Sequence, residues 1–176
     1  MKFLYLGMES KLIDFLKNYG QVEVFKEKNL DKNFVKKFDW IISYGYRFLI
    51  KKEILKITKN PIINLHISYL PYNRGADPNY WSFKEKSLKG VSIHKIDNSI
   101  DGGDIYVQKR LYFKNKETLR SSYNILKKEI EDLFIKNLTD IISGKIVAYK
   151  QSGKGTIHYK RQRPKKINYD IKVNEI

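Results

Sequence analysis

A single stretch organises this chain: Asn64-Leu65-His66-Ile67-Ser68-Tyr69-Leu70-Pro71, which continues the apolar run Pro61-Ile62-Ile63. The run predicts a buried β-strand, and the proline and the basic, glycine-containing loop at 72–75 predict its end. Because side chains alternate across a strand, Asn64 and His66 point to the same side. An amide donor and a titratable imidazole therefore meet at the carboxyl end of a strand, where open α/β sheets bind ligands.

A second stretch, Ile100-Asp101-Gly102-Gly103-Asp104-Ile105, places a carboxylate before a pair of glycines. The segments NLHISYLPYNRGADPNYW (64–81) and GVSIHKIDNSIDGGDI (90–105) together resemble the formyltransferase family that uses N10-formyltetrahydrofolate. Its signature is an Asn-x-His pair, a Leu-Pro-x-x-Arg-Gly-like loop, and an Asp-x-Gly loop after a Gly-Val-x-x-His-like strand. All three parts occur here in order, and the similarity covers roughly residues 39–113.

The resemblance implies an enzyme, an N-formyltransferase, with Asn64, His66 and Asp101 as its catalytic residues. The amide of Asn64 would donate to the oxyanion that forms when an amine attacks the formyl carbon. His66 would take the amine proton or, when protonated, help to hold the oxyanion, and Asp101 would orient the imidazole or relay the proton. Asp104 is a competing carboxylate, but the family pattern places the catalytic one before the glycines. We therefore interpret Asp104 as a loop or strand-start residue.

The resemblance also implies residues that bind the two substrates. The co-substrate N10-formyltetrahydrofolate would contact Phe48, Leu49, Ile50, Ile100 and Gly102. The acceptor would contact Gly7, Ser10, Arg74, Tyr80 and Trp81. Plainer interpretations stay open: residues 48–50 fit ordinary core, Gly7 and Ser10 fit a simple turn and helix cap, and Tyr80 and Trp81 fit helix packing.

The acceptor amine is less clearly indicated. The segment 72–81 resembles that of nucleotide-sugar N-formyltransferases more than that of glycinamide ribonucleotide transformylase, and the methionyl-tRNA enzyme carries a further C-terminal domain for which this chain has no length. We therefore expect a nucleotide-linked aminodeoxy sugar, destined for surface polysaccharide, as the acceptor. Two features depart from the family: Ile67 follows the catalytic histidine where proline is frequent, and little chain follows the long helix. The alternatives are a formyltransferase for another amine, of methionyl-tRNA or glycinamide ribonucleotide type, and a non-catalytic basic protein that binds polyanions. A homodimer is also left open.

Composition narrows the class of protein. With 176 residues, 41% of them hydrophobic, the chain predicts one globular domain. It contains no cysteine and only three widely spaced histidines, so we expect no disulfide and no metal site. No apolar run approaches the ~20 residues of a membrane span and no signal peptide is recognised, which favours a cytoplasmic protein without a membrane partner. The net charge of +16 comes mostly from dispersed lysines, so it predicts a solvated surface or attraction of anionic substrates rather than a specific nucleic-acid site.

Patterning and resemblance together predict an α/β, Rossmann-like formyltransferase fold, with a mostly parallel twisted sheet flanked by helices and a long C-terminal helix. The expected strands cover 2–7, 21–25, 39–44, 61–65, 91–96 and 105–113. The expected helices follow Ser10, lie within 29–38 and 51–58, follow Asp77 with Pro78 in the first turn, and span 118–143. We assign 1–146 to the catalytic core and 147–176 to a basic C-terminal extension of the same domain. His94 is expected to be structural or to support the site, and His158 to be solvated.

Overall fold

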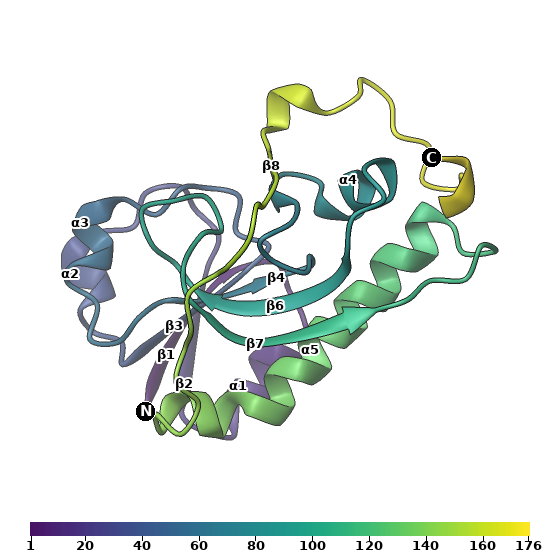
Figure 1. Ribbon diagram of the computed structural model, residues 1–176. Helices are drawn as coiled ribbons and strands as arrows, with labels where there is room; N and C mark the ends of the chain where they lie inside the picture. Colours follow the sequence, from purple (N-terminus) through teal and green to yellow (C-terminus); the bar gives the residue numbers. More distant parts are fainter.

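The computed structural model describes residues 1–176, in which a six-stranded sheet carries helices on both faces (Figure 1). The strand order is β2-β1-β3-β4-β6-β7, and β5 and β8 form a separate two-stranded ribbon. The strands are β1 (Lys2–Gly7), β2 (Gln21–Phe25), β3 (Trp40–Tyr44), β4 (Ile63–His66), β5 (Arg74–Gly75), β6 (Lys89–Lys95), β7 (Ile105–Leu111) and β8 (Ile157–His158). The helices are α1 (Leu12–Lys17), α2 (Lys32–Val35), α3 (Lys52–Leu55), α4 (Pro78–Lys84), α5 (Leu119–Ile142) and the 3-10 turns η1 (Lys160–Gln162) and η2 (Val173–Glu175).

The direction of the strands confirms the predicted fold class. Strands β2, β1, β3 and β4 run parallel, whereas β6 is antiparallel to β4. Strand β7 is antiparallel to β6 and so runs in the same direction as β4. The chain order reverses between β1 and β3, and the carboxyl ends of such neighbouring strands form the usual ligand-binding crevice of an open α/β sheet. Asn64 and His66, at the carboxyl end of β4, therefore lie on the side of the sheet where open α/β proteins bind ligands.

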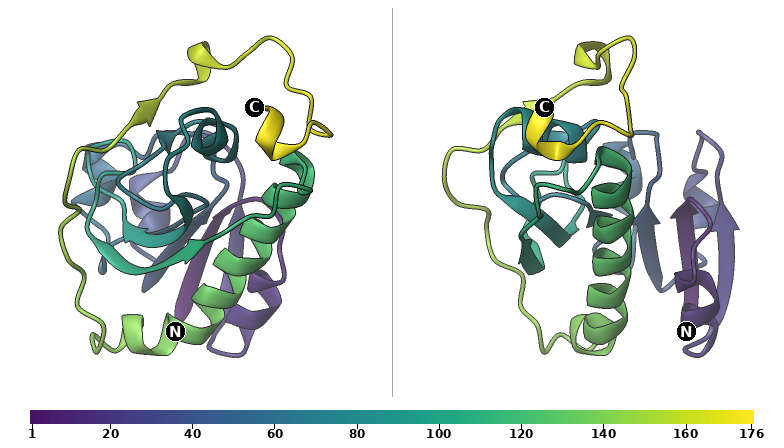
Figure 2. Two further views of the ribbon diagram at one scale, coloured as in Figure 1. Left: turned by 45° about the vertical axis from the view of Figure 1, so that its right-hand side comes forward. Right: turned by 90° about the vertical axis from the view of Figure 1, so that its right-hand side faces the viewer.

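Strand β1 has an unbroken apolar sequence because it is buried on both faces. Phe3 and Tyr5 point into the core cluster shared with α1 and α5, while Leu4 and Leu6 point into a second cluster shared with α2 and α3. All four side chains are fully buried. Helices cover both faces of the sheet (Figure 2), so the side chains on both faces of β1 meet apolar neighbours.

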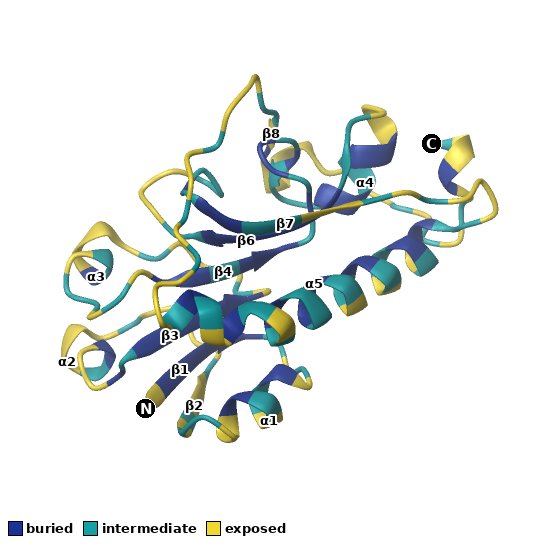
Figure 3. Ribbon diagram, turned by 60° about the horizontal axis from the view of Figure 1, so that its bottom comes forward, coloured by how far each residue is buried: buried dark blue, intermediate teal, exposed yellow.

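The long helix α5 covers one face of the sheet. Its start is fixed by a reciprocal pair: Thr118 Oγ1 accepts from the Ser121 backbone N–H at 3.1 Å, and Ser121 Oγ accepts from the Thr118 N–H at 2.9 Å. One stripe of the helix is buried (Figure 3), and its apolar members are Leu119, Leu126, Ile130, Phe134, Leu138 and Ile141. This spacing of three and four residues is the periodicity that predicted the helix, and Gly144, with φ of 75°, follows its end.

Residues after α5 fold back onto the core. Tyr149 forms an antiparallel bridge with Ile105, and β8 pairs in parallel with β5. Further on, Val173 packs with Phe83 and Leu119 in a small third cluster, next to the start of α5 (Figure 1). The extension therefore contacts both the sheet and the helices.

Some local predictions need correction. Ser10 Oγ accepts from the Leu12 N–H at 3.2 Å, but the residue at the cap position of α1 is Lys11. Asp77 does precede Pro78 at the start of α4, yet its φ of 52° turns the backbone into the left-handed region and its side chain makes no capping bond. Strand β6 ends at Lys95, so Ile96, the last residue of the predicted strand 91–96, lies in the following loop. Among the helices, none combines the length and apolar character needed to cross a membrane.

Candidate active site

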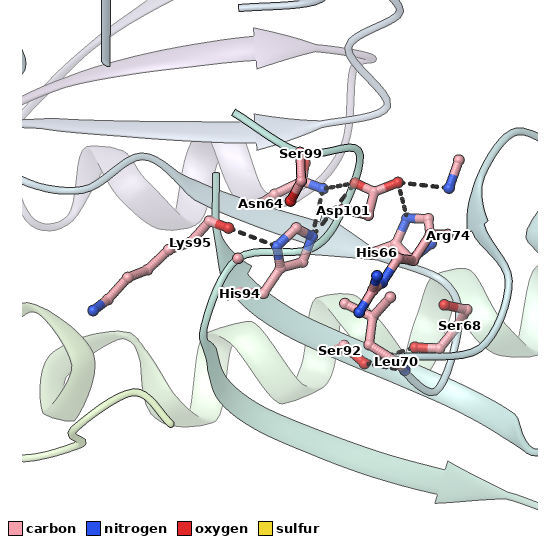
Figure 4. A network of polar contacts seen from close by, with 12 residues as sticks. Asn64, His66, Ser68, Leu70, Arg74, Ser92, His94, Lys95, Ser99 and Asp101 are labelled. Atoms are coloured by element: carbon pink, nitrogen blue, oxygen red, sulfur yellow. Dashed lines mark hydrogen bonds and ion pairs between the residues drawn. The ribbon is translucent and has the colours of Figure 1, made fainter. Parts of the chain in front are cut away.

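The three predicted catalytic side chains converge at the end of β4 (Figure 4). Asn64 and His66 point to the same side of the strand, as the alternation requires, and Asp101 reaches them from the loop between β6 and β7. Asn64 Nδ2 donates to Asp101 Oδ1 at 3.2 Å, and His66 Nδ1 lies 3.6 Å from Asp101 Oδ2. The Asp101 carboxylate thus contacts both of the other two residues of the trio.

The loop that carries Asp101 is held in an unusual backbone conformation. Asp101 has a φ of 46°, in the left-handed region that non-glycine residues rarely adopt. Its Oδ2 accepts from the backbone N–H of Gly75 at 2.9 Å, which connects this loop to the loop after β4. In contrast, the Asp104 carboxylate lies 3.5 Å from Lys95 Nζ, consistent with its predicted role as a strand-start residue.

His94 contacts two residues of the trio, in agreement with the prediction that it is structural or supports the site. In the register of β4 and β6 it is paired directly with Asn64, and its side chain is 1% exposed. Its Nδ1 lies 2.7 Å from the carbonyl oxygen of Lys95, so Nδ1 carries a proton. In the neutral ring Nε2 is then an acceptor, and Asn64 Nδ2 donates to it at 3.0 Å. His94 therefore fixes which way the Asn64 amide faces.

A similar argument assigns the proton on His66. Its Nε2 lies 3.1 Å from the carbonyl oxygen of Asn73, and because a carbonyl only accepts, Nε2 is the protonated nitrogen of the neutral ring. The lone pair on Nδ1 then faces the site, beside Asp101 Oδ2. This is the tautomer that a general base requires.

Burial and neighbours set the charges of this pair. Burial lowers the pKa of His66 below its ordinary value of 6.5, the carboxylate of Asp101 opposes this by raising it, and His94 lowers it further. Burial alone would raise the pKa of Asp101, but His66, His94 and the Gly75 N–H outweigh it and hold that pKa well below its usual range. At neutral pH the site therefore contains a neutral imidazole beside an ionised carboxylate.

The residues assigned to folate lie at the same edge of the sheet. The segment 48–50 follows β3, whose last residue, Tyr44, is paired with Leu65 of β4. Phe48, Leu49 and Ile50 therefore lie beyond the carboxyl ends of the parallel strands. Leu49 is 83% exposed and Phe48 38%, which is unusual for apolar side chains in ordinary core. Ile100 and Gly102 flank Asp101 directly. Their contact with a folate stays a prediction.

The residues assigned to the acceptor lie in three places, of which the one that holds Tyr80 and Trp81 is described below. Arg74 lies beside the catalytic trio, because the backbone N–H of the following residue, Gly75, donates to the Asp101 carboxylate. Gly7, with φ of 118°, and Ser10 lie instead at the end of β1, where the Ser10 hydroxyl bonds Tyr5 Oη at 2.8 Å. The hollow that Ser10 helps to line contains carboxylates and a single lysine: its residues are Glu9, Ser10, Ile13, Asp14, Val24 and Lys26.

The prediction that His158 is solvated is wrong. Its ring is 7% exposed and stacks on Trp81, with centroids 4.1 Å apart and planes 6° from parallel. His158 Nε2 also lies 3.0 Å from Glu85 Oε1. Tyr80 meets Trp81 edge-on at 5.2 Å, so both aromatic residues pack against protein neighbours, and their contact with an acceptor stays a prediction.

Sequence reasoning also missed Gln151. Its side chain contacts both the Arg74 guanidinium and the loop of Asp101. No local pattern marks this residue, since its partners lie 50 and 77 positions away. The structure contains no group of three or more His, Cys, Asp or Glu side chains placed to hold a metal ion.

Comparisons with known proteins identify the family to which this sequence and fold are similar. The family model described as formyl transferase matches residues 9–138. The methionyl-tRNA formyltransferase of Thermodesulfovibrio yellowstonii is 34% identical over 162 residues, which are 85% of this chain and 51% of that protein. The chain thus spans about half the length of the curated relatives that it matches.

Two solved structures show the likeness in three dimensions. The formyltransferase PseJ from Anoxybacillus kamchatkensis, crystallised with UDP-4,6-dideoxy-4-formamido-L-AltNAc and tetrahydrofolate, is 41% identical with a TM-score of 0.93, over 99% of this chain and 97% of that chain. The N-formyltransferase from Helicobacter canadensis, in complex with folinic acid and dTDP-3-aminofucose, has a TM-score of 0.80 at 22% identity, over 96% of this chain and 75% of that chain. The second likeness is one of fold.

Proposed function

The chain belongs to the formyl transferase family, and on that premise we propose that it transfers a formyl group from N10-formyltetrahydrofolate to the amine of a nucleotide-linked aminodeoxy sugar. The observation that carries this choice is the nearly end-to-end likeness to PseJ, whose structure contains a UDP-linked formamido sugar together with tetrahydrofolate. Those two molecules are a formylated acceptor and a spent formyl donor. The convergent trio at the end of β4 supplies the chemistry that such a transfer needs.

In the proposed reaction the neutral amine of the sugar attacks the formyl carbon. The formyl oxygen then becomes an oxyanion, and the Asn64 amide is the uncharged donor of the trio that stabilises it. His66 accepts the amine proton on Nδ1, and the ionised Asp101 beside it stabilises the imidazolium that results. Collapse of the intermediate breaks the bond between carbon and N10 of the folate, and His66 returns the proton to N10.

A second candidate acceptor is methionyl-tRNA. It is favoured by the curated relatives, of which the enzyme of T. yellowstonii is 34% identical. The basic surface, with a net charge of +16, would suit an RNA as well as a nucleotide diphosphate. We rank the sugar first because the PseJ likeness is closer and covers nearly the whole of both chains.

One assay separates these candidates. The protein is incubated with N10-formyltetrahydrofolate and, in parallel, with a panel of aminodeoxy nucleotide sugars, methionyl-tRNA and glycinamide ribonucleotide. Release of tetrahydrofolate and the mass gain of one formyl group on a sugar amine are expected. Formylation of methionyl-tRNA alone would replace the proposed acceptor. Absence of any product, together with no folate-dependent rise in melting temperature, would refute the transferase reaction.

Two further proposals and one open alternative need their own measurements. We infer that the formylated sugar enters surface polysaccharide and that the reaction takes place in the cytoplasm, while a homodimer is the alternative that stays open. Deletion of the gene with analysis of the polysaccharide tests the first, fractionation tests the second, and the mass of the protein in solution tests the third. The competing idea of a polyanion-binding protein predicts tight binding to random nucleic acid that weakens steeply with salt.

A further inference from the structure

The chain after α5 returns to the active site through one side chain, that of Gln151. Upstream of it, Tyr149 and Ile105 exchange backbone hydrogen bonds of 2.8 and 2.9 Å in an antiparallel bridge. In antiparallel pairing, residues that follow one partner lie opposite residues that precede the other. Gln151 therefore lies beside the loop of Asp101, although it is outside the residues 9–138 that the family model matches.

All the hydrogen-bonding capacity of the Gln151 amide is used. Its Nε2 donates to the carbonyl oxygens of Asp101 and Gly103, both at 2.8 Å. Its Oε1 accepts from Arg74 Nε at 3.1 Å and from Arg74 Nη2 at 2.7 Å. Because a guanidinium only donates and a carbonyl only accepts, the amide fits in one orientation alone.

These four bonds act on the two loops that form the site. The carbonyl groups that Gln151 holds flank Gly102, so they fix the backbone from which the Asp101 carboxylate projects at its left-handed φ of 46°. On the other side, the residue after Arg74 is Gly75, whose N–H binds the same carboxylate at 2.9 Å. Arg74, Gln151, Asp101 and Gly75 thus form a closed ring of contacts. Displacing one member moves the others.

We propose that Gln151 is a positioning residue that holds the catalytic carboxylate of Asp101 and the acceptor-binding guanidinium of Arg74 in one fixed relation. The inference rests on the proposed function, since it concerns how the acceptor is aligned with the reacting groups. A neutral amide suits the role because it orients Arg74 without neutralising its charge. That charge stays available for an anionic acceptor, such as the diphosphate of a nucleotide sugar.

Two substitutions and one control test the proposal. Q151M keeps the length of the side chain and removes all four bonds. Q151E keeps an oxygen for Arg74 but places its second oxygen against two carbonyl groups and pairs the arginine with a negative charge. Q162M is the matched control, because Gln162 lies in the same extension and its Oε1 accepts only from the backbone N–H of Tyr159.

For both Gln151 variants we expect kcat to fall roughly 10–100-fold, as for small displacements of catalytic groups, with a several-fold higher KM for the acceptor and an unchanged melting temperature. Q162M should match the wild type. A general loosening of the structure would instead lower the melting temperature in step with the loss of activity. That result, or wild-type kinetics in both variants, would overturn the assignment.

A second readout does not depend on turnover. The imidazole of His66 is titrated by NMR without substrates, where the titratable groups that face it are Asp101 and His94. If Gln151 holds the carboxylate in place, Q151M titrates at a lower pH than the wild type, because the nearby negative charge raises the pKa of His66. An unchanged titration would contradict the proposal. If the wild-type protein forms no product at all, the proposed function fails, and this titration still decides the role of Gln151.

Discussion

Replacing Asp101 by asparagine tests the role of the carboxylate charge in the site. The substitution keeps the shape of the side chain and removes the charge that faces His66 Nδ1 at 3.6 Å. For unit charges at that separation, an effective dielectric constant of roughly 20 gives about 4–5 kcal/mol between carboxylate and imidazolium. Since each 1.36 kcal/mol is about tenfold in rate, that energy corresponds to a fall in kcat of roughly 10³–10⁴-fold.

The measurements are kcat and the pH dependence of kcat/KM, which reports the free enzyme, with the melting temperature as a check on folding. The acid limb should also move to lower pH in D101N, because the carboxylate raises the pKa of His66 and its removal lets that pKa fall further. The matched control is D104N, whose carboxylate pairs with Lys95 and is 38% exposed. A D101N enzyme within threefold or so of the wild type, or one no slower than D104N, would refute the reasoning.

Three other substitutions or conditions give distinct outcomes. In the wild type, the acid limb of kcat/KM should have its midpoint below 6.5, because burial lowers the pKa of His66 and the base is lost only as pH falls through that value; a midpoint above 6.5 would contradict the neutral, buried base. Leu49→Ser should leave the melting temperature unchanged, since the side chain is 83% exposed, but weaken folate binding roughly tenfold by calorimetry if this leucine is buried by the pterin. Phe134→Ala removes a fully buried ring from α5 and should lower the free energy of unfolding by about 3–5 kcal/mol in denaturant titrations, whereas a loss under 1 kcal/mol or so would mean that the core repacks.

Local patterns were sufficient for most of the fold. Strands β1 and β2 have the predicted bounds, and α5 differs from the prediction by one residue at each end. These elements are specified by short-range features: an unbroken apolar run, alternation, and a stripe at helical spacing between Thr118 and Gly144. Asp77 is an exception: it precedes Pro78 at the start of α4 as predicted, but at its φ of 52° the side chain makes no capping hydrogen bond.

Only part of the site could be predicted from the sequence, and the reason is physical. Its trio is carried by short motifs, so the residue types and their spacing are visible in the chain. The contacts of His94 depend on the antiparallel register of β6 against β4, which places it opposite Asn64, and no local pattern reveals that register. For the same reason the basic composition around His158 predicted a solvated ring, while its stacking partner Trp81 lies far away in sequence.

The remaining question is how Asn64 stabilises an oxyanion when both of its amide hydrogens are engaged, with Asp101 at 3.2 Å and His94 at 3.0 Å. The bond to Asp101 is at the long end of the usual range, about 2.7–3.2 Å, so it is the easier one to exchange. A developing negative charge at the formyl oxygen is a strong acceptor only while the intermediate exists. Exchanging the bond then stabilises the transition state more than the ground state, which is the condition for acceleration. His94, whose tautomer is fixed by the carbonyl of Lys95, would keep the second amide hydrogen and so hold the orientation of Asn64 through the exchange.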